Sequence, residues 1–194
     1  HEEHEGHEEH EGHEEHEGHE EHEENRPDPH AWLDPENGKL WLDAIASELS
    51  LIDPINSATY RANAESGKLE IDAVIAEVEA TLSRVLDIQF LVFHDAYQYF
   101  ENRLGISAIG AITVADAVDP SPARILELNN LVKKTGVICI FSEPQFNPGL
   151  IRSVMGDAIV KSHVIDPLGT QLELGKHFYP QLIRSIAQTL ASCL

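Results

Sequence analysis

Four short apolar runs, separated by stretches with helical spacing, constrain the fold of this chain more than any other feature. The runs cover residues 89–93, 106–112, 137–141 and 159–165. Helices are expected at residues 96–103, 121–134, 148–155 and 174–191. Apolar strands that alternate with helices are typical of a parallel sheet buried on both faces. We therefore predict an α/β fold with a parallel four-stranded sheet covered by helices.

Two helical segments are expected before the first of these runs. A helix is predicted over residues 34–51, with Asp34 as its N-cap and Pro35 at its first position. Its apolar pattern consists of Leu40, Trp41, Ala44, Ile45 and Leu49. One long helix is expected over residues 55–86, with Gly67 as the point where it bends or loosens.

The first 24 residues differ from the rest of the chain. They form four near-copies of the hexapeptide His-Glu-Glu-His-Glu-Gly, with histidines at His1, His4, His7, His10, His13, His16, His19 and His22. The tract has no apolar residue to bury, so it is expected to be disordered. Neutral imidazoles are good zinc ligands, and clustered carboxylates attract cations. We predict a weak, multi-site metal collector here; the alternative is an inert solubilising linker.

The charge of the chain is dominated by this tract. The formal net charge is −21, and −8 of it lies outside residues 1–24, which hold thirteen glutamates and no basic residue. A moderately acidic chain argues against nucleic acid or an anionic membrane as partner. No run approaches the roughly 18–20 apolar residues of a membrane span. Because the chain begins inside a repeat and without methionine, we expect a fragment or a product cut from a longer protein.

Polar side chains follow the apolar runs, where open parallel sheets bind ligands. His94 and Asp95 follow the first run, Thr113 the second, Glu143 the third and Asp166 the fourth. His94 and Asp166 are good metal ligands, and Glu143 is a further candidate. The alternatives are structural: a helix cap for Asp95, a buried pair for Glu143 and a simple turn at Asp166.

His30 is the other candidate ligand. It lies between Pro29 and Pro35, which restrict the backbone and predict a stiff, extended loop. The alternative is an exposed loop histidine. His163 and His177 are interpreted as core or surface residues. No phosphate-binding loop and no common catalytic signature is present.

Cys139 and Cys193 are the only cysteines, and their spacing does not suit a metal-binding pair. Two free thiols would be typical of a reducing compartment. A disulfide between a core strand and the C-terminal tail would suit an oxidising one. The residues alone leave both readings open.

Several motifs together resemble one known family, the zinc-binding receptors of bacterial zinc-uptake ABC transporters (the ZnuA family). The resemblance covers the whole chain and rests on the His-Glu tract, on the two cysteines and on four further segments. These are Asp28-Pro29-His30-Ala31-Trp32-Leu33-Asp34-Pro35, Phe93-His94-Asp95-Ala96-Tyr97-Gln98-Tyr99-Phe100, Ser142-Glu143-Pro144-Gln145-Phe146 and Asp166-Pro167-Leu168-Gly169.

The resemblance implies two α/β lobes joined by a long rigid helix, with Zn²⁺ bound in the cleft between them. His30 matches the ligand at the end of the first lobe, and His94 matches the ligand of the second lobe. Asp166 matches a position that supplies a carboxylate in manganese-binding and some zinc-binding relatives. The family's disulfide maps onto Cys139 and Cys193, which implies a periplasmic location.

The resemblance also implies a division of the chain into a metal-collecting loop, a remnant of the first lobe, an inter-lobe helix and the second lobe. These parts cover residues 1–24, 25–53, 54–87 and 88–194. The family's first histidine ligand lies in a part absent from this sequence, so we expect the loop of His30 to lack its brace and the site to bind zinc more weakly than a two-lobe protein.

The implied function is a receptor, not an enzyme, that captures Zn²⁺ and delivers it to a membrane permease, most simply as a monomer. Manganese is the alternative cargo within the same family. A zinc hydrolase is a second alternative, because two histidines, a carboxylate and an open position also describe a catalytic site. A metal buffer, in which only the tract matters, is a third.

Overall fold

The computed structural model describes residues 27–84, 86–113 and 119–193, so the predicted metal-collecting tract lies outside the described residues. The helical elements are η1 (Ala31–Leu33), α1 (Pro35–Ile52), η2 (Pro54–Asn56), α2 (Ser57–Leu82), α3 (Gln98–Leu104), α4 (Pro122–Thr135), α5 (Pro148–Met155) and α6 (Phe178–Ala191). The strands are β1 (Phe90–His94), β2 (Ala111–Thr113), β3 (Cys139–Ser142) and β4 (Lys161–Val164).

The four strands form one sheet in the order β2-β1-β3-β4, and every neighbouring pair is parallel. The predicted fold class is therefore confirmed. β1 occupies an interior position, and all five of its residues are buried. Register places His94 of β1 beside Thr113 of β2, so both lie at the carboxyl edge of the sheet.

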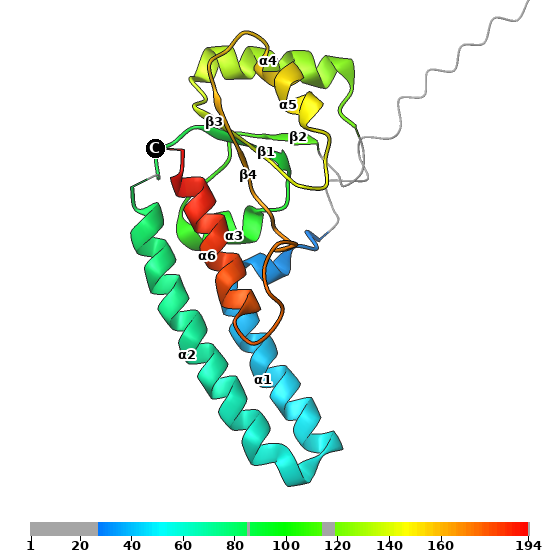
Figure 1. Cartoon of the computed structure of the whole chain (residues 1–194), viewed down its shortest axis with the longest axis vertical. Coiled ribbons are helices and arrows are strands. Elements are labelled where there is room, and N and C mark those ends of the chain that lie inside the picture. The colour runs from blue at the N-terminus through cyan, green and yellow to red at the C-terminus, as the bar shows by residue number, and fades with distance from the viewer. Residues whose placement is uncertain (1–26, 85, 114–118, 194) are drawn as a thin grey trace, which may run out of the picture.

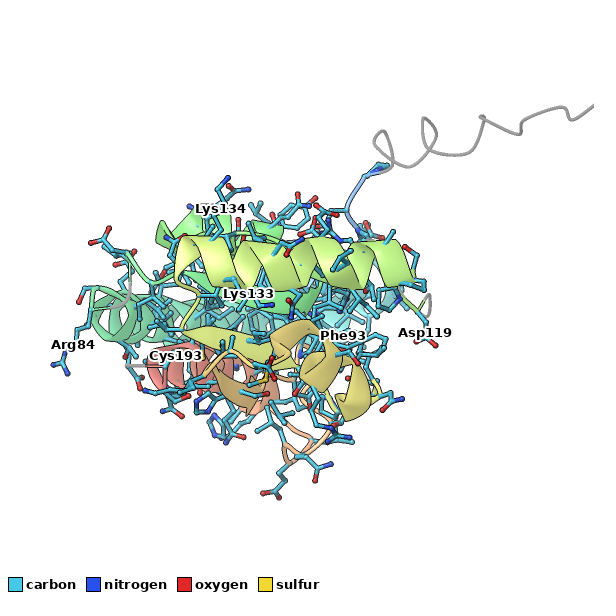
Figure 2. The ribbon with its side chains drawn as sticks, turned by 90° about the horizontal axis from the view of Figure 1, so that it is seen from above. Arg84, Phe93, Asp119, Lys133, Lys134 and Cys193 are labelled. Carbon is cyan, nitrogen blue, oxygen red and sulfur yellow. A yellow bond between two sulfur atoms is a disulfide. The ribbon has the colours of Figure 1, made fainter. Side chains whose placement is uncertain are left out.

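Helices cover both faces of the sheet, as the apolar runs predict. Figure 1 shows α4 and α5 on one side of the sheet and α3 and α6 on the other. Seen from above, α4 lies in front of the sheet (Figure 2). Alternate residues of β1 divide between two cores, with Val92 on the α6 side and Phe93 on the α4 side. Burial of one such large side chain stabilises the fold by about 1.5–3 kcal/mol.

The long helix α2 pairs with α1, and the two extend together from the sheet (Figure 1). Its second half joins the α6-side core through Val74, Val78 and Leu82. α2 runs uninterrupted through Gly67, contrary to the expected loosening. A Cβ atom at Gly67 would lie 2.9 Å from Leu42 of α1, so the missing side chain allows the two helices to approach closely.

The start of α1 is as predicted, with the Asp34 carboxylate accepting a hydrogen bond from the Glu36 backbone N–H and Pro35 at the first helical position. The apolar pattern of α1 nevertheless faces outward in the structure. Its exposed residues are Leu40, Trp41, Ala44, Ile45 and Leu49. α1 is buried only at Pro35, Gly38 and Ala46.

A disulfide joins Cys139 of β3 to Cys193 after α6, the pairing that the family resemblance implied. It links the sheet to the end of the chain across a sequence separation of 54 residues. Among the described residues, no helix is both long and apolar enough to span a membrane.

Candidate metal centre

His94 occupies the last position of β1, where the strand delivers its side chain to the carboxyl edge of the sheet. Only 5% of the residue is exposed. β1 pairs with β2 at His94 itself and with β3 at Phe90 and Leu91, so the sheet positions the strand that carries the imidazole.

Glu143, directly after β3, holds the ring of His94. Its Oε1 lies 2.6 Å from His94 Nδ1, and only 3% of Glu143 is exposed. A carboxylate can only accept, so this short contact places the hydrogen on Nδ1 and leaves the lone pair on Nε2. Metal-ligating histidines are commonly fixed by such a carboxylate. Of the alternatives considered from sequence, the structure supports a buried pair for Glu143.

His30 is held by a carboxylate from its own loop. Asp28 Oδ1 lies 2.6 Å from His30 Nδ1 and also accepts the His30 backbone N–H at 2.9 Å. Pro29 lies between the two residues and stiffens this short loop. His30 is 8% exposed, so it is a buried side chain and not an exposed loop histidine. The Asp-Pro-His sequence places the two residues close enough for this contact, which the sequence analysis did not predict.

The two histidines, 64 residues apart in sequence, meet through their Nε2 atoms, which lie 3.4 Å apart. With both Nδ1 hydrogens directed at carboxylates, neutral imidazoles bring two lone pairs together at this point. Such lone pairs repel unless a cation or a proton lies between them. Two nitrogens at 2.0–2.1 Å from one tetrahedral zinc are about 3.3–3.4 Å apart, so the observed separation fits a shared zinc ion.

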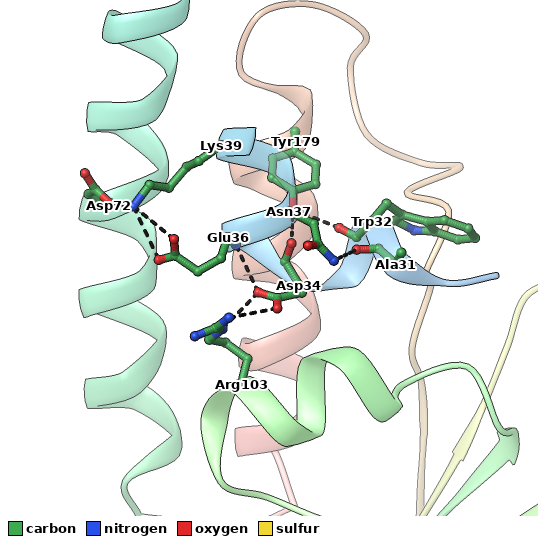
Figure 3. A network of polar contacts seen from close by, with 9 residues as sticks. All are labelled: Ala31, Trp32, Asp34, Glu36, Asn37, Lys39, Asp72, Arg103 and Tyr179. Carbon is green, nitrogen blue, oxygen red and sulfur yellow. Dashed lines mark hydrogen bonds and ion pairs between the residues drawn. The ribbon is translucent and has the colours of Figure 1, made fainter. Parts of the chain in front are cut away.

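A polar network holds the loop of His30 to the rest of the fold (Figure 3). The Arg103 guanidinium of α3 donates two hydrogen bonds of 2.9 Å to the Asp34 carboxylate. Tyr179 Oη of α6 donates to the Trp32 carbonyl oxygen at 2.8 Å. The expectation that this loop lacks a brace is therefore wrong, because α3 and α6 supply one.

Asp166 lies in a turn after β4, and its carboxylate serves that turn. Oδ1 accepts the backbone N–H groups of Leu168 and Gly169, while Oδ2 accepts the N–H and the hydroxyl of Thr170. Trp32 Nε1 donates to the Pro167 carbonyl oxygen at 3.1 Å, which ties the turn to the loop of His30. Among the described residues, no third histidine, cysteine or carboxylate joins His30 and His94 in a set with all ligand atoms within 4.8 Å.

Tyr97 is a buried polar residue beside this pair that the sequence analysis did not single out as a candidate functional residue. Its ring lies 6.3 Å from that of His94, and 2% of the residue is exposed. Burial raises the pKa of the hydroxyl well above its usual value, and the charges of Glu143 and Asp166 act in the same direction. The hydroxyl has no hydrogen-bond partner of ordinary geometry within the described part of the chain.

The remaining candidates serve the structure. Thr113 Oγ1 donates to the Phe93 carbonyl oxygen, and Asp95 accepts a hydrogen bond from the Gln98 side chain. His177 is exposed and pairs with Glu70 of α2, as expected for a surface histidine. The eight histidines of the N-terminal tract lie outside the described residues.

Comparison with known proteins gives a family match over almost the whole chain. The family model described as "ZnuA: Zinc-uptake complex component A periplasmic" matches residues 1–193. The high-affinity zinc uptake system protein ZnuA of Brucella abortus (strain 2308) is 47% identical over 167 residues, which are 86% of this chain and 50% of that protein. The protein of the same description from Paracoccus denitrificans (strain Pd 1222) is 40% identical over 168 residues, with 86% and 52% covered. The chain thus spans about half the length of the curated relatives it matches.

Solved structures share the fold. One described as "Crystal structure of ZnuA" has a TM-score of 0.75 at 26% identity, covering 86% of this chain and 60% of that chain. A mutant of the laminin-binding adhesin Lmb from Streptococcus agalactiae has a TM-score of 0.75 at 27% identity, with 86% and 63% covered.

Proposed function

We propose, on the premise that this chain belongs to the ZnuA family of periplasmic zinc-uptake components, that it binds Zn²⁺ as cargo between His30 and His94. The chain is a receptor that captures the ion and hands it to the membrane permease of an ABC transporter. The observation that carries this proposal is the 3.4 Å separation of the two Nε2 atoms, each opposite a carboxylate-bound Nδ1.

Zinc fits this site better than manganese, the alternative cargo. Imidazole ligands suit zinc, whereas carboxylates and water suit manganese. Both ligands of the described pair are imidazoles, and the carboxylates of Asp28 and Glu143 contact Nδ1 atoms. A hydrolase would also need a general base or an oxyanion donor near the open coordination positions, whereas the described carboxylates beside the pair, Asp28 and Glu143, are engaged by the Nδ1 atoms.

Asp166 remains our predicted third ligand. Its turn is tied to the loop of His30, and its charge acts on Tyr97 beside His94. Ligation by Asp166 would require one oxygen to give up hydrogen bonds within the turn.

The roles of the other parts of the chain are proposals that rest on family membership. Residues 1–24 collect zinc, residues 25–53 belong to the first lobe, residues 54–87 form the inter-lobe helix and residues 88–194 form the second lobe. The receptor acts as a monomer.

The test separates the tract from the folded pair. Zinc binding is measured by competition against a chromophoric chelator for the full chain, for a chain lacking residues 1–24, and for a His30→Ala/His94→Ala variant of the latter. Deletion of the tract is expected to lower the stoichiometry and leave the tightest site nearly unchanged. The double substitution is expected to remove that site. A His177→Ala variant is the matched control, because His177 is exposed and contacts Glu70.

Three results would contradict the proposal. If removal of residues 1–24 abolished the tightest binding, the tract would be the main site and the chain would act as a buffer. If the double variant bound zinc as tightly as the parent, the facing imidazoles would not be the ligands. Hydrolysis of ester or peptide substrates by the zinc-loaded chain would favour the hydrolase.

A further inference from the structure

A second group of metal-ligating side chains lies away from His30 and His94, at the join between β3, β4 and the end of the chain. It consists of Cys139, His163 and Cys193, which each present one ligand atom within 4.8 Å of the other two. We propose that these three residues bind Zn²⁺ when the disulfide is reduced, giving the chain a redox-dependent second site.

Strand register brings His163 to this position. β3 and β4 pair Cys139 with Lys161 and Phe141 with His163. Side chains two residues apart lie on the same face of a strand, so Cys139 and His163 share the face that α6 covers. The His163 ring lies 6.3 Å from that of Phe141, within the same layer.

The end of the chain brings Cys193 to the same point. Lys161 Nζ donates to the Cys193 carbonyl oxygen at 3.0 Å. Ser192 Oγ contacts His163 Nδ1 at 3.1 Å and donates its own hydrogen to the Thr189 carbonyl oxygen at 2.6 Å. These two contacts hold β4 against the C-terminal turn without using the disulfide. The three ligands are therefore expected to stay together after reduction.

The sulfurs need only a short movement to accept a metal. Two thiolates at about 2.3 Å from a tetrahedral zinc are roughly 3.8 Å apart, compared with about 2.0 Å in a disulfide. A cavity of about 10 Å³, lined by Phe90, Phe141, Leu190 and Cys193 among others, gives the Cys193 side chain space. Cys139 and Cys193 are buried, and His163 is partly exposed, so an ion can enter from the side of His163.

The donor set suits zinc. Two thiolates and one imidazole with a fourth position open to water form a common tetrahedral zinc arrangement. In the first step a dithiol reductant transfers two electrons and two protons to the disulfide, leaving two cysteine thiols and an oxidised, cyclic disulfide of the reductant. In the second step Zn²⁺ binds both sulfurs and the two thiol protons pass to solvent.

Cobalt(II) tests the proposal on the full chain, because a thiolate-to-cobalt charge-transfer absorption reports sulfur ligands and neither His30, His94 nor the N-terminal tract contains sulfur. The chain is titrated with Co²⁺ before and after treatment with a phosphine reductant that binds metals weakly, and zinc is then added. We expect the absorption only after reduction, with a final intensity that corresponds to one thiolate-bound cobalt per chain, and its loss when zinc displaces cobalt.

A His163→Ala variant separates a three-ligand site from two adventitious thiols. Loss of the imidazole is expected to weaken cobalt binding at this site at least tenfold, whereas a His177→Ala control leaves it unchanged. Far-ultraviolet circular dichroism of the reduced chain checks that the fold persists. The proposal is overturned if the reduced chain shows no charge-transfer absorption, or if His163→Ala binds cobalt as the parent does. Neither result bears on the site of His30 and His94, which contains no sulfur.

Discussion

The two histidines of the candidate centre are positioned by different kinds of structure. His94 stands at the end of an interior strand, and its carboxylate partner, 49 residues away in sequence, is 3% exposed. His30 lies in a loop, and its partner Asp28 is two residues away with 16% of its side chain exposed. One candidate ligand is thus carried by a strand paired within the sheet, and the other is held by a local contact and a polar network.

Because of this difference, the site has a rigid side at His94 and an adjustable side at the loop of His30. A strand in the middle of a sheet cannot move without breaking hydrogen bonds on both sides, whereas the loop of His30 is held by side-chain contacts that are individually weak. We infer that His94 defines where the ion sits and that the loop of His30 adapts to it. The following changes test that contrast.

Replacement of either histidine is expected to have the largest effect. His94→Ala and His30→Ala should each weaken zinc binding by more than about 100-fold, since losses at supporting residues alone typically reach 10–100-fold. Only His94→Ala should also lower stability, by about 1–3 kcal/mol, because it leaves the buried Glu143 carboxylate without its partner. Chelator competition and urea unfolding of the metal-free variants measure the two quantities. Equal losses of stability in the two variants would contradict the proposed contrast between the strand position of His94 and the loop position of His30.

Acidification should weaken zinc binding about as strongly as replacement of one of the two histidines. An imidazole must be neutral to ligate zinc, and imidazole in model peptides has a pKa of about 6.5. Zinc binding is therefore expected to weaken as the pH falls, and more steeply if two histidines compete with protons than if only one does. Titrations of the chain lacking residues 1–24 should show this dependence. Release of no more than one proton per zinc bound would indicate that only one imidazole ligates.

Removal of the carboxylate partners should show the asymmetry directly. Glu143→Gln is expected to weaken zinc binding about 10–100-fold, because it neutralises a buried carboxylate that fixes the His94 tautomer. Asp28→Asn is expected to cost less than about tenfold, because the Asp28 side chain is 16% exposed, compared with 1% for Glu143, and its contact is less desolvated. The two isosteric variants are compared by competition at one pH. A larger loss of zinc affinity for Asp28→Asn than for Glu143→Gln would indicate that His30, and not His94, is the more rigidly held histidine.

Weakening the brace of the loop should have the smallest effect. Arg103→Ala removes the paired hydrogen bonds to Asp34, and a partly exposed ion pair contributes about 0.2–1 kcal/mol. We expect zinc binding to weaken by no more than about two- to fivefold, mainly through faster dissociation measured by stopped-flow transfer to a chelator. Arg184→Ala is the control, since Arg184 forms a comparable ion pair with Glu77 of α2. Equal effects of the two variants would assign no special role to the loop brace.

The periodicity of the sequence determined most of the fold. Apolar runs and helical stretches predicted a parallel sheet because a strand buried on both faces needs apolar side chains at every position. Local chemistry placed the start of α1, where the Asp34 cap and Pro35 act within one turn. The long helix, in contrast, ends at Leu82 and not at Leu86. The spacing of apolar residues also did not predict that the missing side chain at Gly67 makes room for Leu42 of α1.

The sequence also identified His30 and His94 as candidate metal ligands, because His30 lies between prolines and His94 comes at the end of an apolar strand. Only the tertiary structure brought their Nε2 atoms to 3.4 Å, placed Glu143 against His94, and set Arg103 and Tyr179 around the loop of His30. Residue spacing reports contacts within one strand, helix or turn, whereas these contacts join elements 49 to 147 positions apart. Such contacts depend on how the sheet and helices pack, which no local pattern specifies.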